Sequence, residues 1–255
     1  MDLAVTTVHL RREFGEFVAV RDIDLAVPAG SFYGFLGLNG AGKSTTIKCL
    51  TGLMQPTSGE MRILGHDAIR DSLAVRRKIG VVPENLALFE RLTGVENLVF
   101  VGRAYGLDPS VVRERTASLL GVMELEEAGG KLVADYSHGM RKKLALACAL
   151  LPNPRLLFLD EPFEGVDAGA SRHLRHLLQR FVERGGTVFL TSHVLAIVEQ
   201  LCDHVGIIHR GELVAQGPVE ELGRESATEG SSLEDLFLER VGVAGSDDAL
   251  EWLAG

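Results

Sequence analysis

The chain has 255 residues, of which 46% are hydrophobic and 24% are charged, a composition typical of folded globular proteins. This length is enough for one large core or two small domains. Its apolar runs are shorter than the ~18 to 20 residues of a membrane-spanning helix, and its first residues lack the basic start of a secretory signal. We therefore expect a soluble protein of a reducing compartment, with its three separated cysteines unpaired.

The formal net charge of −9 argues against a nucleic-acid partner, because proteins that bind nucleic acids usually present basic surfaces. The charge is also uneven along the chain. Residues 224–255 contain eight acidic residues and two arginines, so this end contributes much of the excess. We expect no nucleic-acid partner, and we predict an acidic, helical C-terminal tail over residues 226–255.

Two β-like segments at residues 4–10 and 16–27 come first in the chain and predict short antiparallel strands. They are followed by nearly continuous apolar runs, as expected for strands that are buried on both faces of a parallel sheet. These runs lie at residues 32–37, 78–83, 155–160 and 187–192.

Helical spacing occurs between these strands, at residues 43–53 and 170–184. Residues 93–151 combine several helical patterns without a strong β run, and residues 204–217 have the pattern of a β-hairpin. The order of elements predicts an α/β fold with a mostly parallel sheet, an N-terminal antiparallel β subdomain and a helical insertion.

The segment GLNGAGKS lies between the first apolar run and a predicted helix, and it matches the P-loop pattern G-x-x-x-x-G-K-[ST]. Its glycines leave backbone N–H groups free to surround a phosphate. Lys43 can reach the β- and γ-phosphates of a nucleotide, and the Ser44 hydroxyl can bind Mg²⁺. The N-terminus of the following helix favours an anion. The predicted nucleotide-binding residues here are Gly37, Leu38, Asn39, Gly40, Ala41, Gly42, Lys43, Ser44 and Thr45.

An acidic pair ends the apolar run RLLFLD, where Asp160 is followed by Glu161. Asp160 is expected to hold Mg²⁺, directly or through water, and Glu161 to polarise an attacking water. Acidic residues are also common where an ordinary strand enters a loop, so the pair alone leaves both interpretations open. Together with the P-loop, it favours hydrolysis of a nucleotide such as ATP, with Lys43 and Glu161 as catalytic residues.

The segment YSHGMRKKLALACALLPNPRLLFLDEPFEGVDAGA resembles the signature-to-D-loop block of ATP-binding cassette (ABC) ATPases. In this resemblance, residues 137–140 stand at the signature, residues 164–167 at the D-loop, and His193 at the switch histidine. Phe14 stands at the aromatic A-loop and Glu84 at the Q-loop. The resemblance extends from about residue 3 to residue 220, in the order and spacing of the family.

The resemblance implies a RecA-like P-loop NTPase fold over residues 1–225, with a helical signature subdomain inserted at about residues 85–150. It also implies that two cassettes pair head to tail, as a homodimer or with a related cassette, and enclose ATP between one P-loop and the partner's signature. Ser137 and Gly139 would then face the partner's γ-phosphate from the start of a helix at about Met140 to Leu151. Further implied roles are nucleotide contacts for Phe14, Val20 and Asp167, catalysis through γ-phosphate sensing for His193, and Mg²⁺ binding for Glu84.

The chain departs from the usual family pattern at His138 and Met140 in the signature, and at Glu84, where glutamine is usual. Ser137 and Gly139 are retained, so we expect ATPase activity to persist. These variants, and the segment at residues 232–242, resemble bacterial cassettes that serve multidrug, antibiotic and lipid exporters. For Phe14, packing in the core is the alternative to stacking on adenine.

The leading interpretation is therefore the ATP-hydrolysing subunit of an ABC transporter, held at the cytoplasmic face of the membrane by a separate permease that docks near residues 86–98. The alternative is a soluble ABC ATPase that acts on nucleic acid or ribosomes. Such relatives usually carry tandem cassettes or a long insertion, whereas only 51 residues separate Glu84 from Tyr136. A nucleotide-binding regulator without turnover is disfavoured because Glu161 and His193 are both present.

Overall fold

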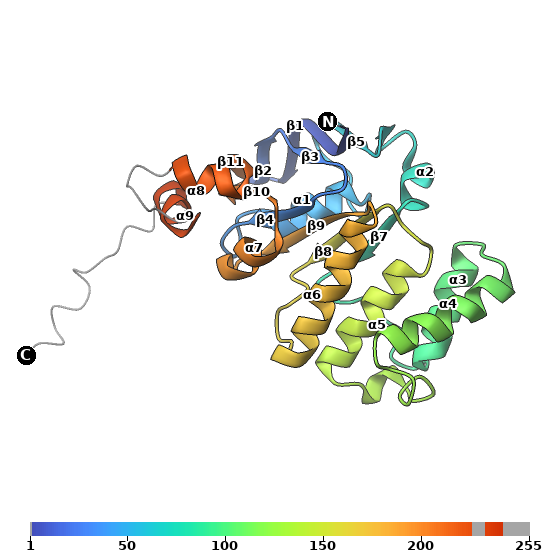
Figure 1. Cartoon of the computed structure of the whole chain (residues 1–255). Helices are drawn as coiled ribbons and strands as arrows, with labels where there is room; N and C mark the ends of the chain where they lie inside the picture. Colours follow the sequence, from blue (N-terminus) through green and yellow to red (C-terminus); the bar gives the residue numbers. More distant parts are fainter. Residues whose placement is uncertain (1, 226–232, 242–255) are drawn as a thin grey trace, which may run out of the picture.

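The computed structural model describes residues 2–225 and 233–241 (Figure 1). The strands are β1 (Leu3–Phe14), β2 (Phe17–Ile23), β3 (Ala26–Pro28), β4 (Phe32–Leu36), β5 (Ser58–Ile63), β6 (His66–Asp67), β7 (Ile79–Val82), β8 (Leu156–Asp160), β9 (Thr187–Ser192), β10 (His204–His209) and β11 (Glu212–Pro218). The helices are α1 (Lys43–Leu50), α2 (Ser72–Arg76), α3 (Gly94–Ala104), α4 (Pro109–Val122), α5 (His138–Leu150), α6 (Ala168–Glu183), α7 (Leu195–Leu201), α8 (Val219–Glu225) and α9 (Leu233–Val241), with a short 3-10 helix at Val133–Asp135.

The centre of the sheet is parallel, with β10, β4, β9, β8 and β7 side by side in that order. Every residue of β4, β8 and β9 is buried, because α1 packs on one side of the strands and α5 and α6 on the other. This burial explains the nearly continuous apolar runs and confirms the predicted strands. The register pairs Leu36 with Ser192 and Asp160 with Thr191. The carboxyl ends of these strands therefore meet at one edge, where sheets of this class bind ligands.

The antiparallel part of the sheet is formed by β1, which pairs with β2, β3 and β5. β10 and β11 also pair antiparallel and form the predicted hairpin. The first strand is longer than the prediction of residues 4–10, since β1 continues to Phe14. Its register shifts beyond Leu10, next to His9 with a φ of +52°. A bulge of this kind interrupts the alternation of side chains, which is the signal by which a strand is found in sequence.

The helical insertion contains α3, α4 and α5 and lies well away from β1 and β5 (Figure 1). α5 begins at His138, two residues before the predicted start at Met140. The reason is a helix cap: the Ser137 hydroxyl accepts a hydrogen bond from the Met140 N–H at 3.2 Å. His138 and Gly139 therefore belong to the first turn of the helix.

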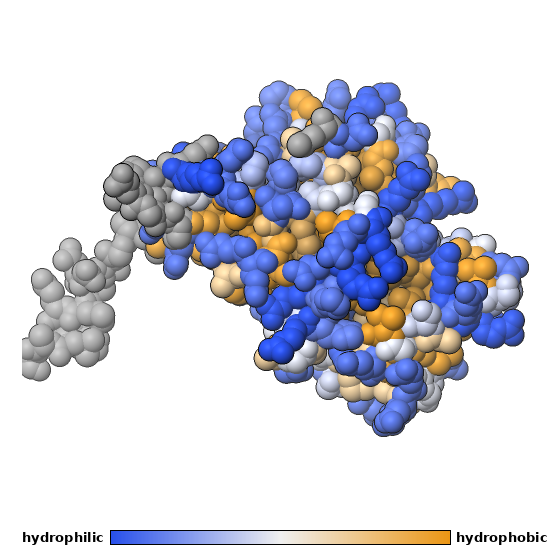
Figure 2. All heavy atoms as spheres, in the orientation of Figure 1, coloured by the Kyte–Doolittle hydropathy of each residue, from blue (hydrophilic) through white to orange (hydrophobic). Residues whose placement is uncertain are grey.

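Two hydrophobic clusters hold the elements together. One surrounds Phe189, whose ring lies 5.4, 5.4 and 5.5 Å from the rings of Tyr33, Phe35 and Phe158. The other joins the parallel strands to α5, α6, α7 and α9, and Figure 2 shows apolar atoms around α7 and beside α5 on an otherwise largely hydrophilic face. Of the predicted C-terminal tail, only α9 falls within the described residues. Over the described ranges, no helix has the length and hydropathy needed to cross a bilayer.

Candidate active site

An open cavity of about 380 Å³ lies at the carboxyl edge of the parallel strands, beside the loop of residues 37–42. Two glycines of this loop are required by the backbone. A Cβ at Gly37 would lie 2.5 Å from the carbonyl oxygen of Ile208. Gly42 has a φ of +112°, and a Cβ there would lie 2.6 Å from the carbonyl oxygen of Ala19. The glycines thus let the loop pass close to neighbouring main chain, as a phosphate-binding loop requires.

Residues from several strands meet in the cavity. The loop after β4 and the start of α1 contribute most of the wall, and residues of β2 and residues that follow β7, β8 and β9 complete it. The lining residues are Phe17, Ala19, Leu38, Asn39, Gly40, Gly42, Lys43, Ser44, Thr45, Glu84, Glu161, Glu164 and His193. Most of the predicted P-loop, metal-binding and catalytic residues are therefore brought together. Gly37 and Ala41 are buried behind the wall and shape the loop.

Lys43 places a positive charge at the base of the cavity, with only 6% of the residue exposed. Its ammonium donates to the carbonyl oxygens of Gly37, at 2.7 Å, and Leu38, at 3.3 Å. It also lies 3.4 Å from Oε1 of Glu161. Because an ammonium is a compact charge with three rotatable donors, phosphate oxygens can replace these partners without moving the lysine far.

Asp160 is the buried acid of the site, 3% exposed at the end of β8. Its Oδ1 accepts hydrogen bonds from the Ser44 hydroxyl at 3.2 Å and from the Thr191 hydroxyl at 2.6 Å. The Thr191 hydroxyl in turn accepts the N–H of Glu161 at 3.0 Å. Thr191 therefore fixes the side chain of one acid and the main chain of the next.

Glu161 extends into the cavity between the side chains of Lys43 and His193. Oε2 lies 3.1 Å from Nδ1 of His193, and Oε1 faces Lys43. The residue has a φ of +47°, a conformation that non-glycine residues rarely adopt and that costs about 1–3 kcal/mol. Within the described chain, no group donates a hydrogen bond to the buried Oε1. This oxygen, which lies 3.4 Å from the Lys43 ammonium, can accept a further hydrogen bond.

The signature residues lie elsewhere. Within the described residues, neither Ser137 nor Gly139 lines the cavity. A Cβ at Gly139 would meet Oδ2 of Asp167 at 3.4 Å and Cβ of Ala170 at 3.7 Å, which are ordinary contacts. Packing within the chain therefore does not require glycine here. Asp167 caps α6 through hydrogen bonds from the N–H groups of Gly169 and Ala170, and these bonds lower the pKa of its carboxyl group.

The assignment of Val20 to the nucleotide is wrong. Val20 is fully buried in the hydrophobic core, because side chains alternate along β2 and Phe17 and Ala19 lie on the face toward the cavity. Phe14 pairs with Phe17 across the end of the β1–β2 hairpin. It is 42% exposed and carries the Arg12 guanidinium 4.5 Å from its ring centre, which disagrees with burial in the core. Its stacking on adenine stays a prediction, since the described cavity wall includes Phe17 instead.

Several residues of the site escaped the sequence analysis. Thr191 had one available signal, a polar residue near the end of an otherwise apolar strand. Phe17 and Ala19 could have been found from strand alternation. Lys142, whose ammonium donates to the carbonyl oxygen of Glu161 at 2.6 Å, gave no signal, because basic residues are ordinary in a helix.

Comparisons with known proteins agree with this geometry. Residues 20–164 match the family described as ABC transporter. The chain is 36% identical to a daunorubicin resistance ATP-binding protein of Streptomyces coeruleorubidus, over 100% of this chain and 79% of that protein. A solved ATP-binding subunit of an ABC transporter superposes with a TM-score of 0.86 at 33% identity, over 94% of this chain and 99% of the other. A dimeric ATP-binding cassette in a post-hydrolysis state, bound to ADP and Pi, gives 0.76 at 27% identity, over 84% and 98% of the two chains.

The chain belongs to the ABC transporter family, in which it is an ATP-binding subunit. Its curved α/β sheet with a P-loop is the fold of these cassettes, which confirms the predicted fold class. ATP hydrolysis is likewise the activity of the family, consistent with a relative captured after the reaction.

Proposed function

We propose that this subunit powers an exporter of drug-like or antibiotic molecules. The observation that carries the proposal is the similarity, along the whole chain, to an ATP-binding protein of daunorubicin resistance. The variants at Glu84 and His138 point to the same branch. The transported compound itself contacts other parts of a transporter, so we propose a class of substrate and no single compound.

In the proposed reaction, Glu161 acts as the general base toward water that attacks the γ-phosphate of ATP. Its Oε1 is a buried acceptor, and its contacts with Lys43 and His193 fix the direction of the carboxylate. Lys43 moves its hydrogen bonds from the loop carbonyl groups to the β- and γ-phosphates. His193 lies on the opposite side of Glu161 and is proposed to sense the γ-phosphate.

Mg²⁺ is proposed as the cofactor, because the available donors are hard oxygen atoms of the kind this ion prefers. Ser44 and Asp160 already share a hydrogen bond, and the exposed carboxylate of Glu84 lines the same cavity. These three residues would hold the ion. When bound, it would neutralise charge on the β- and γ-phosphates.

The second half of each ATP site is proposed to come from another cassette, either a second copy of this chain or a related chain. Gly139 supports this arrangement, because among the described residues a Cβ at this position would meet only ordinary contacts. The Ser137-capped start of α5 offers N–H groups and the positive end of a helix to a phosphate. The dimeric cassette with ADP and Pi supports pairing in the family.

A separate membrane permease is proposed to dock on the helical insertion and to hold the subunit at the cytoplasmic face of the membrane. Phe89 and Phe100 pack edge to face, with ring centres 4.7 Å apart, yet are 49% and 48% exposed. Such a pair suits an apolar helix from a partner. Phe89 follows Glu84 by five residues, so docking there can reach the nucleotide site. We propose no nucleic-acid partner.

Affinity capture from detergent-solubilised membranes tests this function. An integral membrane protein should co-purify, and inside-out vesicles that contain the pair should accumulate a fluorescent anthracycline when ATP is added. Vesicles with Glu161→Gln are the control and should not accumulate it. Failure to recover a membrane protein, or equal uptake with Glu161→Gln, would contradict the proposal.

A further inference from the structure

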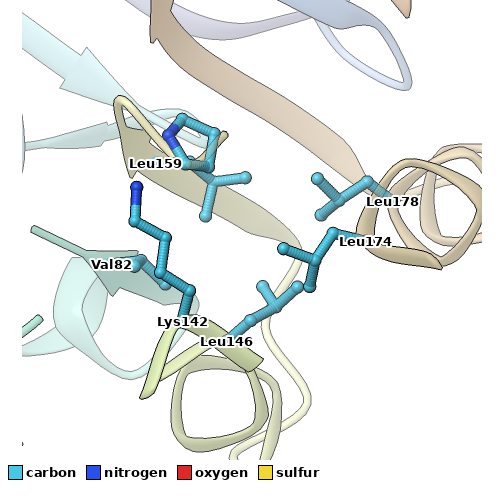
Figure 3. A pocket seen from close by; sticks show the side chains of 7 residues that line it. Val82, Lys142, Leu146, Leu159, Leu174 and Leu178 are labelled. Atoms are coloured by element: carbon cyan, nitrogen blue, oxygen red, sulfur yellow. The ribbon is translucent and has the colours of Figure 1, made fainter. Parts of the chain in front are cut away.

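Lys142 is a buried cation outside the P-loop. It lies in the second turn of α5 and is only 6% exposed. Figure 3 shows its stem rising from α5 beside the strands that carry Val82 and Leu159, at the edge of a cavity of about 10 Å³ whose other labelled walls are apolar. These walls are formed by Val82, Leu146, Leu159, Leu174 and Leu178.

Burial of this ammonium is unfavourable unless its donors are used. Desolvation lowers the pKa of Lys142, while the negative charges of Glu164, Glu161, Glu84 and Asp160 act in the opposite direction. A leucine or methionine would fill the apolar surroundings without desolvating a charge. Apolar packing alone therefore does not explain why a lysine ammonium is buried at this position.

The charged atom, Nζ of Lys142, lies beside the main chain of Glu161. Nζ of Lys142 donates to the main-chain carbonyl oxygen of Glu161 at 2.6 Å. Glu161 has the strained φ of +47°, and its N–H is held by Thr191. The two hydrogen bonds therefore fix the main chain of Glu161 on both sides of its Cα, and this determines where the carboxylate points.

We propose that Lys142 is a positioning residue for ATP hydrolysis, holding the main chain of Glu161 so that its carboxylate stays aimed at the attacking water. The inference rests on the proposed role of Glu161 as the base. Lys142 is not among the described residues that line the P-loop cavity. The same helix carries Gly139 in its first turn and is capped by Ser137, so it connects the proposed partner-facing residues to the main chain of Glu161.

The chain offers a matched control in Lys143. It is the next residue of α5, it is 9% exposed, and its ammonium pairs with Glu124 at 2.6 Å, away from Glu161. Lys142→Met and Lys143→Met each remove one charge from the same helix and keep a flexible stem. Only Lys142→Met removes the hydrogen bond to Glu161.

We expect Lys142→Met to lower kcat at least about tenfold with KM for ATP within about twofold, the pattern of an interaction that acts after binding. Lys143→Met should retain kcat, and Lys142→Met should melt no lower than Lys143→Met. Lys142→Gln, which keeps a shorter N–H donor, should give an intermediate kcat and serves as the second variant if Lys142→Met does not fold. Glu161→Gln is measured alongside.

Equal kcat for Lys142→Met and Lys143→Met, with Glu161→Gln inactive, would overturn the positioning role alone. If Lys142→Met does not fold, wild-type kcat in Lys142→Gln would overturn it. Normal turnover in Glu161→Gln would instead refute Glu161 as the base. A rise in KM without a change in kcat would assign Lys142 to nucleotide binding and would also overturn the proposal.

Discussion

The P-loop cavity and the start of α5 carry the two groups of residues that we propose face a phosphate. They differ in how far contacts within the chain account for their residues. In the cavity, several polar side chains pair with residues from distant parts of the sequence, such as Ser44 with Asp160 and His193 with Glu161. At the start of α5, Ser137 caps its own helix, and a Cβ at Gly139 would make only ordinary contacts.

Glycine is needed for different reasons in the two regions. Glycines 37 and 42 are glycine because neighbouring main chain leaves no space for Cβ. Within the described residues, no main-chain contact of this kind requires glycine at position 139, so we expect the requirement to come from the partner's ATP. Mutations in the cavity should therefore affect a single chain, whereas mutations at Gly139 should act only on the assembled pair.

Lys43→Ala should have the largest effect, a loss of ATP affinity. Lys43 lies in the P-loop cavity, which a single chain forms. The ammonium is expected to form two charge-assisted hydrogen bonds to phosphates, so its loss should weaken ATP binding by roughly 3–6 kcal/mol. Binding of a fluorescent ATP analogue measures the change. Lys48→Ala, an exposed lysine on the same helix, is the control and should bind normally. Wild-type affinity of Lys43→Ala would remove the P-loop lysine from the site.

Mixing two inactive variants tests whether the two halves come from different chains. Lys43→Ala damages the P-loop half and Gly139→Leu the signature half. A heterodimer then has one site with both lesions and one site with none. An equal mixture should show about a quarter of the wild-type ATPase rate, because half of the random dimers are mixed and each keeps one intact site.

The control mixture combines Lys43→Ala with Glu161→Gln, whose lesions lie on the same half. Each site of that heterodimer keeps one lesion, so no activity should return. Gly139→Leu should melt like the wild type, and leucine avoids placing a second carboxylate beside Asp167 in the same chain. Recovery in the control mixture, or full activity of Gly139→Leu alone, would contradict the shared site.

The sequence predicts the cavity well because its determinants are local. A glycine-rich loop after an apolar strand, and an acidic pair at the end of another, are patterns within ten residues. The parallel order of the strands then brings Asp160 and Ser44 together. Contacts such as those of Thr191 with Asp160 or Lys142 with Glu161 depend on how separate elements pack, which no local pattern records.

The errors have the same origin. Val20 was assigned to the nucleotide one position away from Ala19, and a shift of one residue in a strand reverses the face. The start of α5 was placed at Met140, although Ser137 is a good N-cap residue whose hydroxyl bonds the third N–H of the helix. The predicted start followed the signature pattern of the family. In the structure, Ser137 caps the helix, which therefore begins at His138.

Phe14→Ala should weaken ATP binding by about 1–3 kcal/mol, the range of base–aromatic stacking. The Arg12 guanidinium 4.5 Å from the ring centre indicates that this face accepts a flat partner. Phe14→Tyr should bind normally. Phe17→Ala is the paired test, because Phe17 lies opposite on the hairpin and lines the cavity. A larger loss of affinity in Phe17→Ala would transfer the stacking role to that ring.

Glu84→Gln should change ATPase activity least among these variants. It tests whether Glu84 binds Mg²⁺ in the P-loop cavity. The amide keeps an oxygen donor and loses the negative charge, so Mg²⁺ should bind more weakly while repulsion of the γ-phosphate decreases. We therefore expect kcat within about threefold of the wild type and a higher Mg²⁺ concentration at half-maximal ATPase activity. Glu164→Gln removes an equal charge from another exposed residue of the same wall and should leave that midpoint unchanged. If both variants shift the midpoint equally, Glu84 acts only through the general field of the cavity and does not bind the metal.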